Sequence, residues 1–330
     1  MKIAITGGAG FFGSQVVERL IADGHQLFVI DDLSRGRADN LQKAFKTKKL
    51  SFTRADFADP RRAMEWTDQL RRNQVEAIIH MASPMSHNPL DHITGLELAA
   101  SYLRSLATLR IPTVYISTSS ANVISHSRGL LGETIQPEGL YGMTKAFVEW
   151  ALYDLKAKGL VPNYVTLRPS NLYGPREVFS GHSHIHVIPN LIRKALTGEK
   201  TIQVLGDGSQ TRPFTYVDDG VRAVVQAIEV IRRGKTLELA LVHGPQVSIK
   251  EVLGHIMTET GSKARLTWDK SYGGVHSRKL PPHDGKLLGG WKPEVSIKEG
   301  IKETVAWAKA NMDHLIMEDL DERPLGKSLA

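Results

Sequence analysis

Two groups of residues in this chain have types and spacing that could bind a phosphate and move a proton. Gly7, Gly10 and Gly13 follow a short apolar run, and Tyr141 precedes Lys145 by one helical turn. A glycine turn between a strand and a helix lets backbone N–H groups approach a phosphate. On a shared helix face, an ammonium aided by a cationic nicotinamide ring lowers a tyrosine pKa from its usual ~10. Such a pair alone is often a chance surface pair, but beside a glycine turn it predicts a tyrosine base at a dinucleotide site.

The choice between NAD and NADP depends on the end of the second predicted strand. That strand, residues 26–30, ends at Asp31 and Asp32. An acidic residue there accepts hydrogen bonds from the adenosine ribose hydroxyls, which favours NAD. Arg35 and Arg37 lie close behind and could serve a 2′-phosphate, so NADP stays open as the alternative.

Apolar runs alternate with helical patterns through the first half of the chain. The alternation predicts an α/β fold of the Rossmann type, a doubly wound parallel sheet with helices on both faces. Ligands of such sheets bind beyond the carboxyl ends of the strands, where Asp56, Ser83 and Ser120 fall. Ser120 could there hold the substrate oxygen on which Tyr141 acts.

After residue 170 the sequence pattern changes to predicted loops rich in Gly, Pro and His, which alternate with helical stretches. This predicts a smaller, discontinuous C-terminal substrate lobe. The predicted boundaries are a Rossmann domain at 1–170 with 214–243 returning to it, a substrate-binding lobe at 171–213 and 244–312, and a tail at 313–330.

Composition excludes several classes of protein. The chain of 330 residues is 41% hydrophobic and 23% charged and has no cysteine, which excludes disulfides and thiol catalysis. We expect no membrane span and no signal peptide, and a cytoplasmic location. The net charge of +7 is scattered, so an anionic small substrate accounts for it and no nucleic acid is expected. His182, His184 and His186 lack a carboxylate partner in the sequence pattern, so we expect no metal.

Motifs along the chain also carry a family resemblance, from Thr6 to about Trp291. The chain resembles an extended short-chain dehydrogenase/reductase of the NAD-dependent nucleotide-sugar epimerase/dehydratase family, which includes UDP-galactose 4-epimerase. The motifs are TGGAGFFG at 6–13, IDDLSRG at 30–36, IIHMA at 78–82, STSSA at 117–121, YGMTK at 141–145, RPSNLYGP at 168–175 and GDGSQTR at 206–212.

The resemblance implies that NAD is the cofactor and a nucleotide-diphosphate sugar the substrate. The catalytic residues it implies are Tyr141, Lys145 and Ser120. The residues it implies for NAD are Gly7, Gly10, Phe11, Phe12 and Gly13 at the pyrophosphate, Asp31 and Asp32 at the ribose, Asp56 and Phe57 at the adenine, and Met81, Ala82, Ser83, Tyr141, Lys145 and Pro169 elsewhere. The residues it implies for the substrate are Ser120, Asn171, His186, Val187, Arg212 and Arg278. The family usually forms homodimers through helices that correspond here to about 89–109 and 141–158.

The reaction that the resemblance implies is a 4-epimerisation. Tyr141 takes the proton of the sugar 4-hydroxyl while a hydride passes to NAD⁺ and later returns to the other face of the keto sugar. Dehydratases and decarboxylases of the family carry an acid just after the serine/threonine cluster, where Ser120 and Ala121 stand here.

The missing acid favours epimerisation, with an NAD(P)-dependent oxidoreductase as the alternative and a decarboxylase or dehydratase behind it. A non-catalytic cofactor-sensing protein is the alternative from another class. Several positions of the substrate lobe depart from the family pattern, among them Pro213 after Arg212, so the sugar and the base stay open.

Overall fold

A computed structural model describes residues 1–84, 89–121, 137, 139–179, 186–271, 280 and 285–313, with the backbone alone for 89–92 and Ser120. The chain forms two compact units, each built from several segments. The first comprises Met1–Leu172, Val217–Gly244 and Pro281–Glu294, and the second comprises Tyr173–Tyr216, Pro245–Leu280 and Val295–Ala330.

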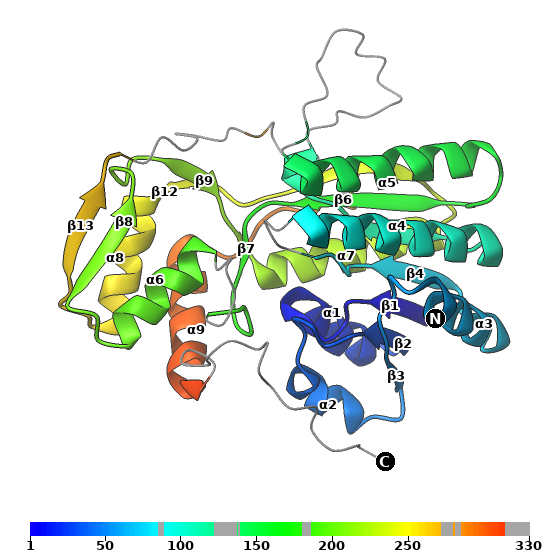
Figure 1. Cartoon of the computed structure of the whole chain (residues 1–330), viewed down its shortest axis with the longest axis horizontal. Helices are drawn as coiled ribbons and strands as arrows, with labels where there is room; N and C mark the ends of the chain where they lie inside the picture. The colour runs from blue at the N-terminus through cyan, green and yellow to red at the C-terminus, as the bar shows by residue number, and fades with distance from the viewer. Residues whose placement is uncertain are drawn as a thin grey trace, which may run out of the picture. The chain divides into compact units, whose positions relative to one another are not determined.

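The first unit is built on a seven-stranded sheet whose neighbouring strands all run parallel (Figure 1). Its strand order, β11-β6-β5-β4-β1-β2-β3, reverses direction between β1 and β4, which confirms the predicted doubly wound Rossmann fold. The strands are β1 (Lys2–Thr6), β2 (Gln26–Asp31), β3 (Leu50–Arg54), β4 (Ala77–His80), β5 (Thr113–Ile116), β6 (Tyr164–Pro169) and β11 (Leu237–Val242).

Alternating side chains of the strands form two cores, one on each face of the sheet. In β1, Ile3 and Ile5 pack with α1 (Phe11–Ala22) and α7 (Val217–Arg232). Ala4, between them, packs with α3 (Pro60–Arg72), α4 (Pro89–Leu109) and α5 (Gly139–Ala157) on the opposite face. The strand period of two therefore fixes which helices cover which face. Short helical turns add η1 (Ala38–Leu41), α2 (Gln42–Phe45) and η2 (Ser119–Ala121).

A late segment of the chain completes the first unit. Leu288 and Trp291 lie in the core beside α1 and α7, and the Trp291 indole N–H donates to the Asp219 carbonyl at 2.9 Å. The sequence prediction assigned this segment to the substrate lobe because its glycines and prolines resemble a loop. The buried indole ties it to the sheet domain instead.

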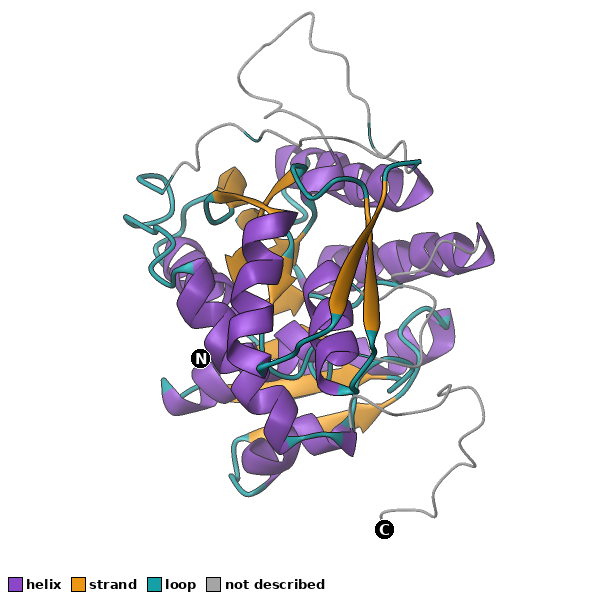
Figure 2. Ribbon diagram, turned by 90° about the vertical axis from the view of Figure 1, so that its left-hand side faces the viewer, coloured by secondary structure: helices purple, strands orange, loops and turns teal. Residues whose placement is uncertain are grey.

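In its described residues, the second unit combines short strand pairs with the helices α6 (Val187–Leu196), α8 (Ile249–Thr260) and α9 (Ile297–Ala310) (Figure 2). These helices pack on one another. The strand pairs are β7 (Leu172–Tyr173) with β10 (Thr215–Tyr216), β9 (Thr211–Pro213) with β12 (Gln246–Ser248), and β8 (Thr201–Leu205) with β13 (Arg265–Asp269). Strands β7 and β9 fall in segments predicted as loops, because two or three residues carry no readable alternation.

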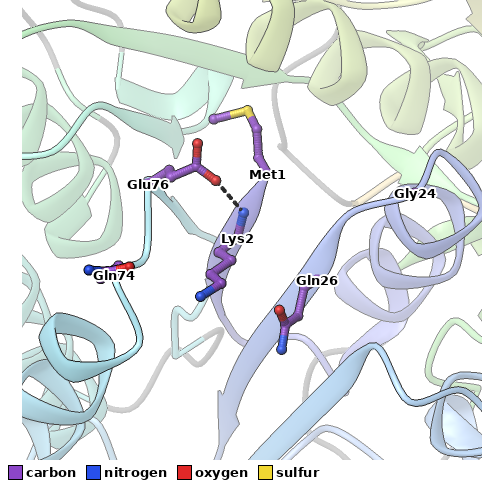
Figure 3. A pocket seen from close by; sticks show the side chains of 6 residues that line it. All are labelled: Met1, Lys2, Gly24, Gln26, Gln74 and Glu76. Carbon is purple, nitrogen blue, oxygen red and sulfur yellow. Dashed lines mark hydrogen bonds between the residues drawn. The ribbon is translucent and has the colours of Figure 1, made fainter.

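A surface hollow lies at the amino ends of the first two strands (Figure 3). Met1 and Lys2 border it at β1 and Gln26 at β2, and the Lys2 main-chain N–H donates to Glu76 Oε2 at 2.7 Å. Ligands of parallel sheets bind at the other, carboxyl edge, so this hollow is separate from the predicted site. Among the described residues no helix is long and apolar enough to cross a membrane.

Candidate active site

The glycine loop between β1 and α1 is packed too closely for any side chain at two positions. Gly7 has φ +73°, and a Cβ on it would lie 2.7 Å from the main-chain nitrogen of Ala82. A Cβ on Gly13 would lie 2.1 Å from the Gly7 carbonyl oxygen. Gly10 is the N-cap of α1 and brings no side chain to the helix N-terminus. The loop therefore forms a cradle at the positive end of a helix dipole, which fits a pyrophosphate.

Asp31, at the end of β2, fastens this loop to the sheet. Its carboxylate is buried and accepts the Ala9 and Leu33 main-chain N–H groups, each at 2.9 Å. Burial raises the Asp31 pKa, and these two hydrogen bonds oppose that shift. Asp32 is exposed and accepts the Ser34 N–H at 2.9 Å. Asp31, not Asp32, therefore borders the cradle, where the sequence predicts a contact with the ribose.

The end of β3 supplies the two residues predicted at the adenine. Asp56 is exposed, and its carboxylate accepts the Ala58 N–H at 2.7 Å. The Phe57 ring is buried edge-on against Trp66, with 5.3 Å between ring centroids. A contact between Phe57 and an adenine would therefore have to come from its main chain.

The end of β4 is held to β1 through a buried hydrogen bond. Thr6 Oγ1 lies 2.7 Å from His80 Nδ1 and accepts the Ala82 N–H at 3.2 Å. The His80 ring stacks on Tyr102 at 4.0 Å, and burial lowers its pKa well below the usual value. His80 is thus a neutral structural residue that fixes Met81, Ala82 and Ser83 at the carboxyl edge.

Tyr141 and Lys145 meet at the same edge, on one face of α5. Lys145 is buried, and its Nζ donates to the Ile116 carbonyl at 2.9 Å, 5.9 Å from the centre of the Tyr141 ring. Burial lowers the Lys145 pKa to about 7, although Glu149 raises it. Burial raises the Tyr141 pKa, and hydrogen bonds from the Thr118 and Ser83 hydroxyls lower it. Of the two groups, Lys145 is therefore the one that titrates near neutral pH, whereas the Tyr141 pKa lies above its usual value and not below it as the sequence predicts.

The ends of β5 and β6 carry the remaining first-unit residues predicted at the site. Ser120 lies in η2, and its side chain falls outside the described part of the chain. Beside it the Ser119 hydroxyl donates to Ser170 Oγ at 3.4 Å, and the Asn171 amide donates to the same oxygen at 3.1 Å. Asn171 is exposed with φ +43°, and Pro169 ends β6.

The other predicted substrate residues belong to the second unit. His186 is the N-cap of α6, and its Nδ1 lies 2.6 Å from Oε1 of the buried Glu177. Val187 begins that helix, and Arg212 lies in β9, with its guanidinium donating to the Thr211 carbonyl at 2.7 Å. Arg278, His182 and His184 lie outside the described residues. Within those residues, no group of three or more His, Asp or Glu side chains could hold a metal.

Four residues near the Tyr141–Lys145 pair escaped the sequence analysis. Thr118 contacts the Tyr141 hydroxyl, and Ser117, Glu149 and Arg168 form a buried cluster behind Lys145. Glu149 could have been found from the sequence, because it follows Lys145 by four positions on the same helix face. Arg168 could also have been found, because it is a charged residue inside an apolar strand.

Comparison with known proteins agrees with the dinucleotide site that this geometry indicates. The model of a family described as the NAD dependent epimerase/dehydratase family matches residues 3–240. The chain belongs to this family.

Three relatives illustrate the different activities for which similar proteins are named. A putative UDP-glucose 4-epimerase of Methanocaldococcus jannaschii is 30% identical over 94% of this chain and 99% of its own length. UDP-glucuronic acid decarboxylase 1 of Xenopus tropicalis is 27% identical over 95% of this chain and 73% of its own length. The solved UDP-glucose 4-epimerase of Thermus thermophilus in complex with NAD has a TM-score of 0.76 and 25% identity, and the match covers 94% and 99% of the two chains.

These findings confirm the predicted family and an NAD-dependent enzyme of the extended short-chain dehydrogenase/reductase type, with NAD as its cofactor. The residues of this chain fit that group. The cradle excludes side chains at Gly7 and Gly13, and the Asp31 carboxylate stands beside it.

Gly13→Ala tests the cradle. We expect the free energy of unfolding to fall by at least about 2 kcal/mol, because the new Cβ forces α1 away from the loop, and NAD binding to be lost. Urea denaturation and calorimetric titration with NAD⁺ measure the two effects.

Gly254→Ala in α8 is the matched control, since its Cβ would meet nothing within 4 Å. It should raise stability by up to about 1 kcal/mol, as alanine does inside a helix, and leave NAD binding unchanged. A Gly13→Ala variant that binds NAD⁺ as wild type does would contradict the cradle.

Proposed function

We propose that this enzyme is a nucleotide-sugar 4-epimerase acting on a UDP-hexose. The observation that carries the proposal is the Tyr141 hydroxyl with the buried Lys145 at the edge of the sheet that bears the glycine cradle. Support comes from the M. jannaschii and T. thermophilus relatives, both of which are named for UDP-glucose 4-epimerisation.

The chain's own residues would move one proton, while bound NAD⁺ supplies a reversible hydride acceptor. Tyr141 Oη takes the proton of the sugar 4-hydroxyl as C4 loses its hydride, and returns it when the hydride comes back to the opposite face. The Lys145 ammonium stabilises the phenolate, and the Thr118 and Ser83 hydroxyls favour it by donating hydrogen bonds. The reaction leaves no net redox change.

The residues around Ser120 favour epimerisation over decarboxylation or elimination. Those reactions need an added acid or base at the sugar, and the segment 117–121 contains only hydroxyl and methyl side chains. Ala121, next to Ser120, is fully buried. A net oxidoreductase stays the second candidate, since Tyr141 and Lys145 would serve one hydride transfer as well as two.

We further propose that Arg212 and the α6 N-terminus with His186 and Val187, all in the second unit, bind the nucleotide diphosphate. A guanidinium matches phosphate oxygens in geometry and charge. Asn171 and Arg278 stay predicted substrate contacts. The cytoplasmic location also stays a prediction.

Purified enzyme should interconvert UDP-glucose and UDP-galactose without consuming added NAD⁺ or NADH. Anion-exchange chromatography of the nucleotide sugars and absorbance at the NADH band measure the two quantities. Stoichiometric NADH formation over many turnovers would establish the oxidoreductase instead, and release of carbon dioxide from UDP-glucuronate a decarboxylase. No conversion of any UDP-, dTDP-, CDP- or GDP-sugar would refute the proposal.

Tyr141→Phe should lower kcat by at least about 100-fold, because it removes the proton acceptor and keeps the ring. NAD binding should persist, measured by calorimetry on the same sample. Tyr153→Phe is the matched control on the same helix, where the side chain is exposed, and it should retain wild-type kcat. Equal activity of Tyr141→Phe and wild type would favour the non-catalytic, cofactor-sensing alternative.

The outer surfaces of α4 and α5 carry exposed apolar side chains at helical spacing. They are Ile93 and Leu96 on α4, and Leu140, Met143, Phe147 and Trp150 on α5. The two helices pack side by side (Figure 1). Because this stripe is apolar and exposed, we propose that a second copy of the chain covers it in a homodimer.

Phe147→Glu should convert the dimer to a monomer, since it places a charge in the centre of the stripe. Light scattering after size-exclusion chromatography gives the mass. Leu205→Glu in β8 is the control, because Leu205 is about as exposed but lies outside the stripe. A wild-type protein that is monomeric at micromolar concentration would disprove the dimer.

A further inference from the structure

A cluster of buried charges lies behind the Tyr141–Lys145 pair, with Glu149 at its centre. The Glu149 and Arg168 side chains are 5% and 4% exposed. Arg168 Nε donates to Glu149 Oε1 at 2.8 Å, and a second guanidinium nitrogen donates to Oε2. The Ser117 hydroxyl donates to Oε1 at 2.5 Å. The carboxylate thus accepts three hydrogen bonds, from the ends of two different strands.

This cluster and Lys145 together clamp α5 to the ends of two strands. Lys145 Nζ donates to the carbonyl of Ile116, the last residue of β5, and the next residue, Ser117, donates to Glu149. Arg168 connects the same carboxylate to the end of β6. Two successive turns of α5 therefore hold the strand end that leads into η2.

The charges around Lys145 give Glu149 a second effect. Tyr141 and Glu149 face Lys145 from α5, the Tyr115 ring faces it from β5 at 5.2 Å, and the neutral His80 lies on β4. Arg168, on β6, is positive and pairs with Glu149. Of these groups Glu149 supplies the negative charge, which opposes the tendency of burial to remove the proton from Lys145.

We propose that Glu149 is a positioning residue for the hydride-transfer site. It holds the ends of β5 and β6 against α5, and its charge keeps Lys145 in the ammonium form beside Tyr141. The kinetic part of this inference rests on the proposed function, whereas the effect on Lys145 does not.

The test follows the Lys145 side chain directly. The full chain is labelled with lysine carrying ¹³C at Cε, and the Lys145 resonance is assigned by its loss in Lys145→Met. In wild type without cofactor it should titrate near pH 7. Glu149→Gln should lower the midpoint by about one pH unit or more, because it removes an opposite charge.

A second variant covers the possibility that Glu149→Gln fails to fold with Arg168 left unpaired. Glu149→Gln/Arg168→Gln removes both charges, and it should still lower the Lys145 midpoint. Asp154→Asn, an exposed carboxylate on the same helix, is the matched control and should leave the midpoint unchanged.

Kinetics give the second readout. In the double variant, the alkaline limb of kcat against pH should move to lower pH by the same amount, with KM for the sugar within about twofold of wild type, since Glu149 touches no substrate. A folded double variant whose Lys145 midpoint equals that of wild type overturns the inference, and Glu149 and Arg168 are then only a structural ion pair. If wild type converts no sugar but the midpoint still shifts, the proposed function fails and the assignment of Glu149 stands.

Discussion

The close approach of α1 to the end of β1 is the constraint on which the cofactor site depends. The chain must turn directly from the strand into a helix whose Gly13 lies against the Gly7 carbonyl, and no side chain fits between them. That contact places the helix N-terminus at the point where the strand order reverses, between β1 and β4. Asp31 and Thr6 then fix the neighbouring strand ends around it through hydrogen bonds to the adjoining loops. The cradle is therefore a property of the crossing itself.

The second half of the site uses a different device, a helix face that carries three functional positions one turn apart. Tyr141 faces the reacting edge, Lys145 reaches the β5 carbonyl, and Glu149 pairs with β6. Lys145 and Glu149 are both buried, so each depends on its neighbours for a favourable charge state. Burial lowers the Lys145 pKa and raises the Tyr141 pKa, so it favours the uncharged form of both groups, and the hydrogen bonds and the Glu149 charge around them oppose it.

The sheet domain could be predicted from the sequence because its signals are local. Apolar runs, glycines and the acidic residue after β2 are all read within a few positions of one another. The Glu149–Arg168 pair could not be predicted in this way. Glu149 and Arg168 are separated along the chain and meet only once α5 packs on β6. The prediction placed Trp291 in the substrate lobe for a similar reason, since a single buried indole ties its loop-like segment to the sheet domain. The substrate residues were hardest to read from the sequence, because short strands such as β9 carry no periodic pattern.

The interleaving of the two units has a consequence for how the chain is made. The seventh strand of the sheet, β11, and the Trp291 anchor follow the first segments of the second unit along the chain. The nucleotide-binding sheet domain therefore stays incomplete on the ribosome until residue 294 has emerged, although its first six strands are ready much earlier. Until β11 is made, β6 presents an unpaired, apolar edge, which is prone to association with other chains. Nascent copies of this enzyme should accordingly depend on a chaperone during the second half of synthesis more than during the first.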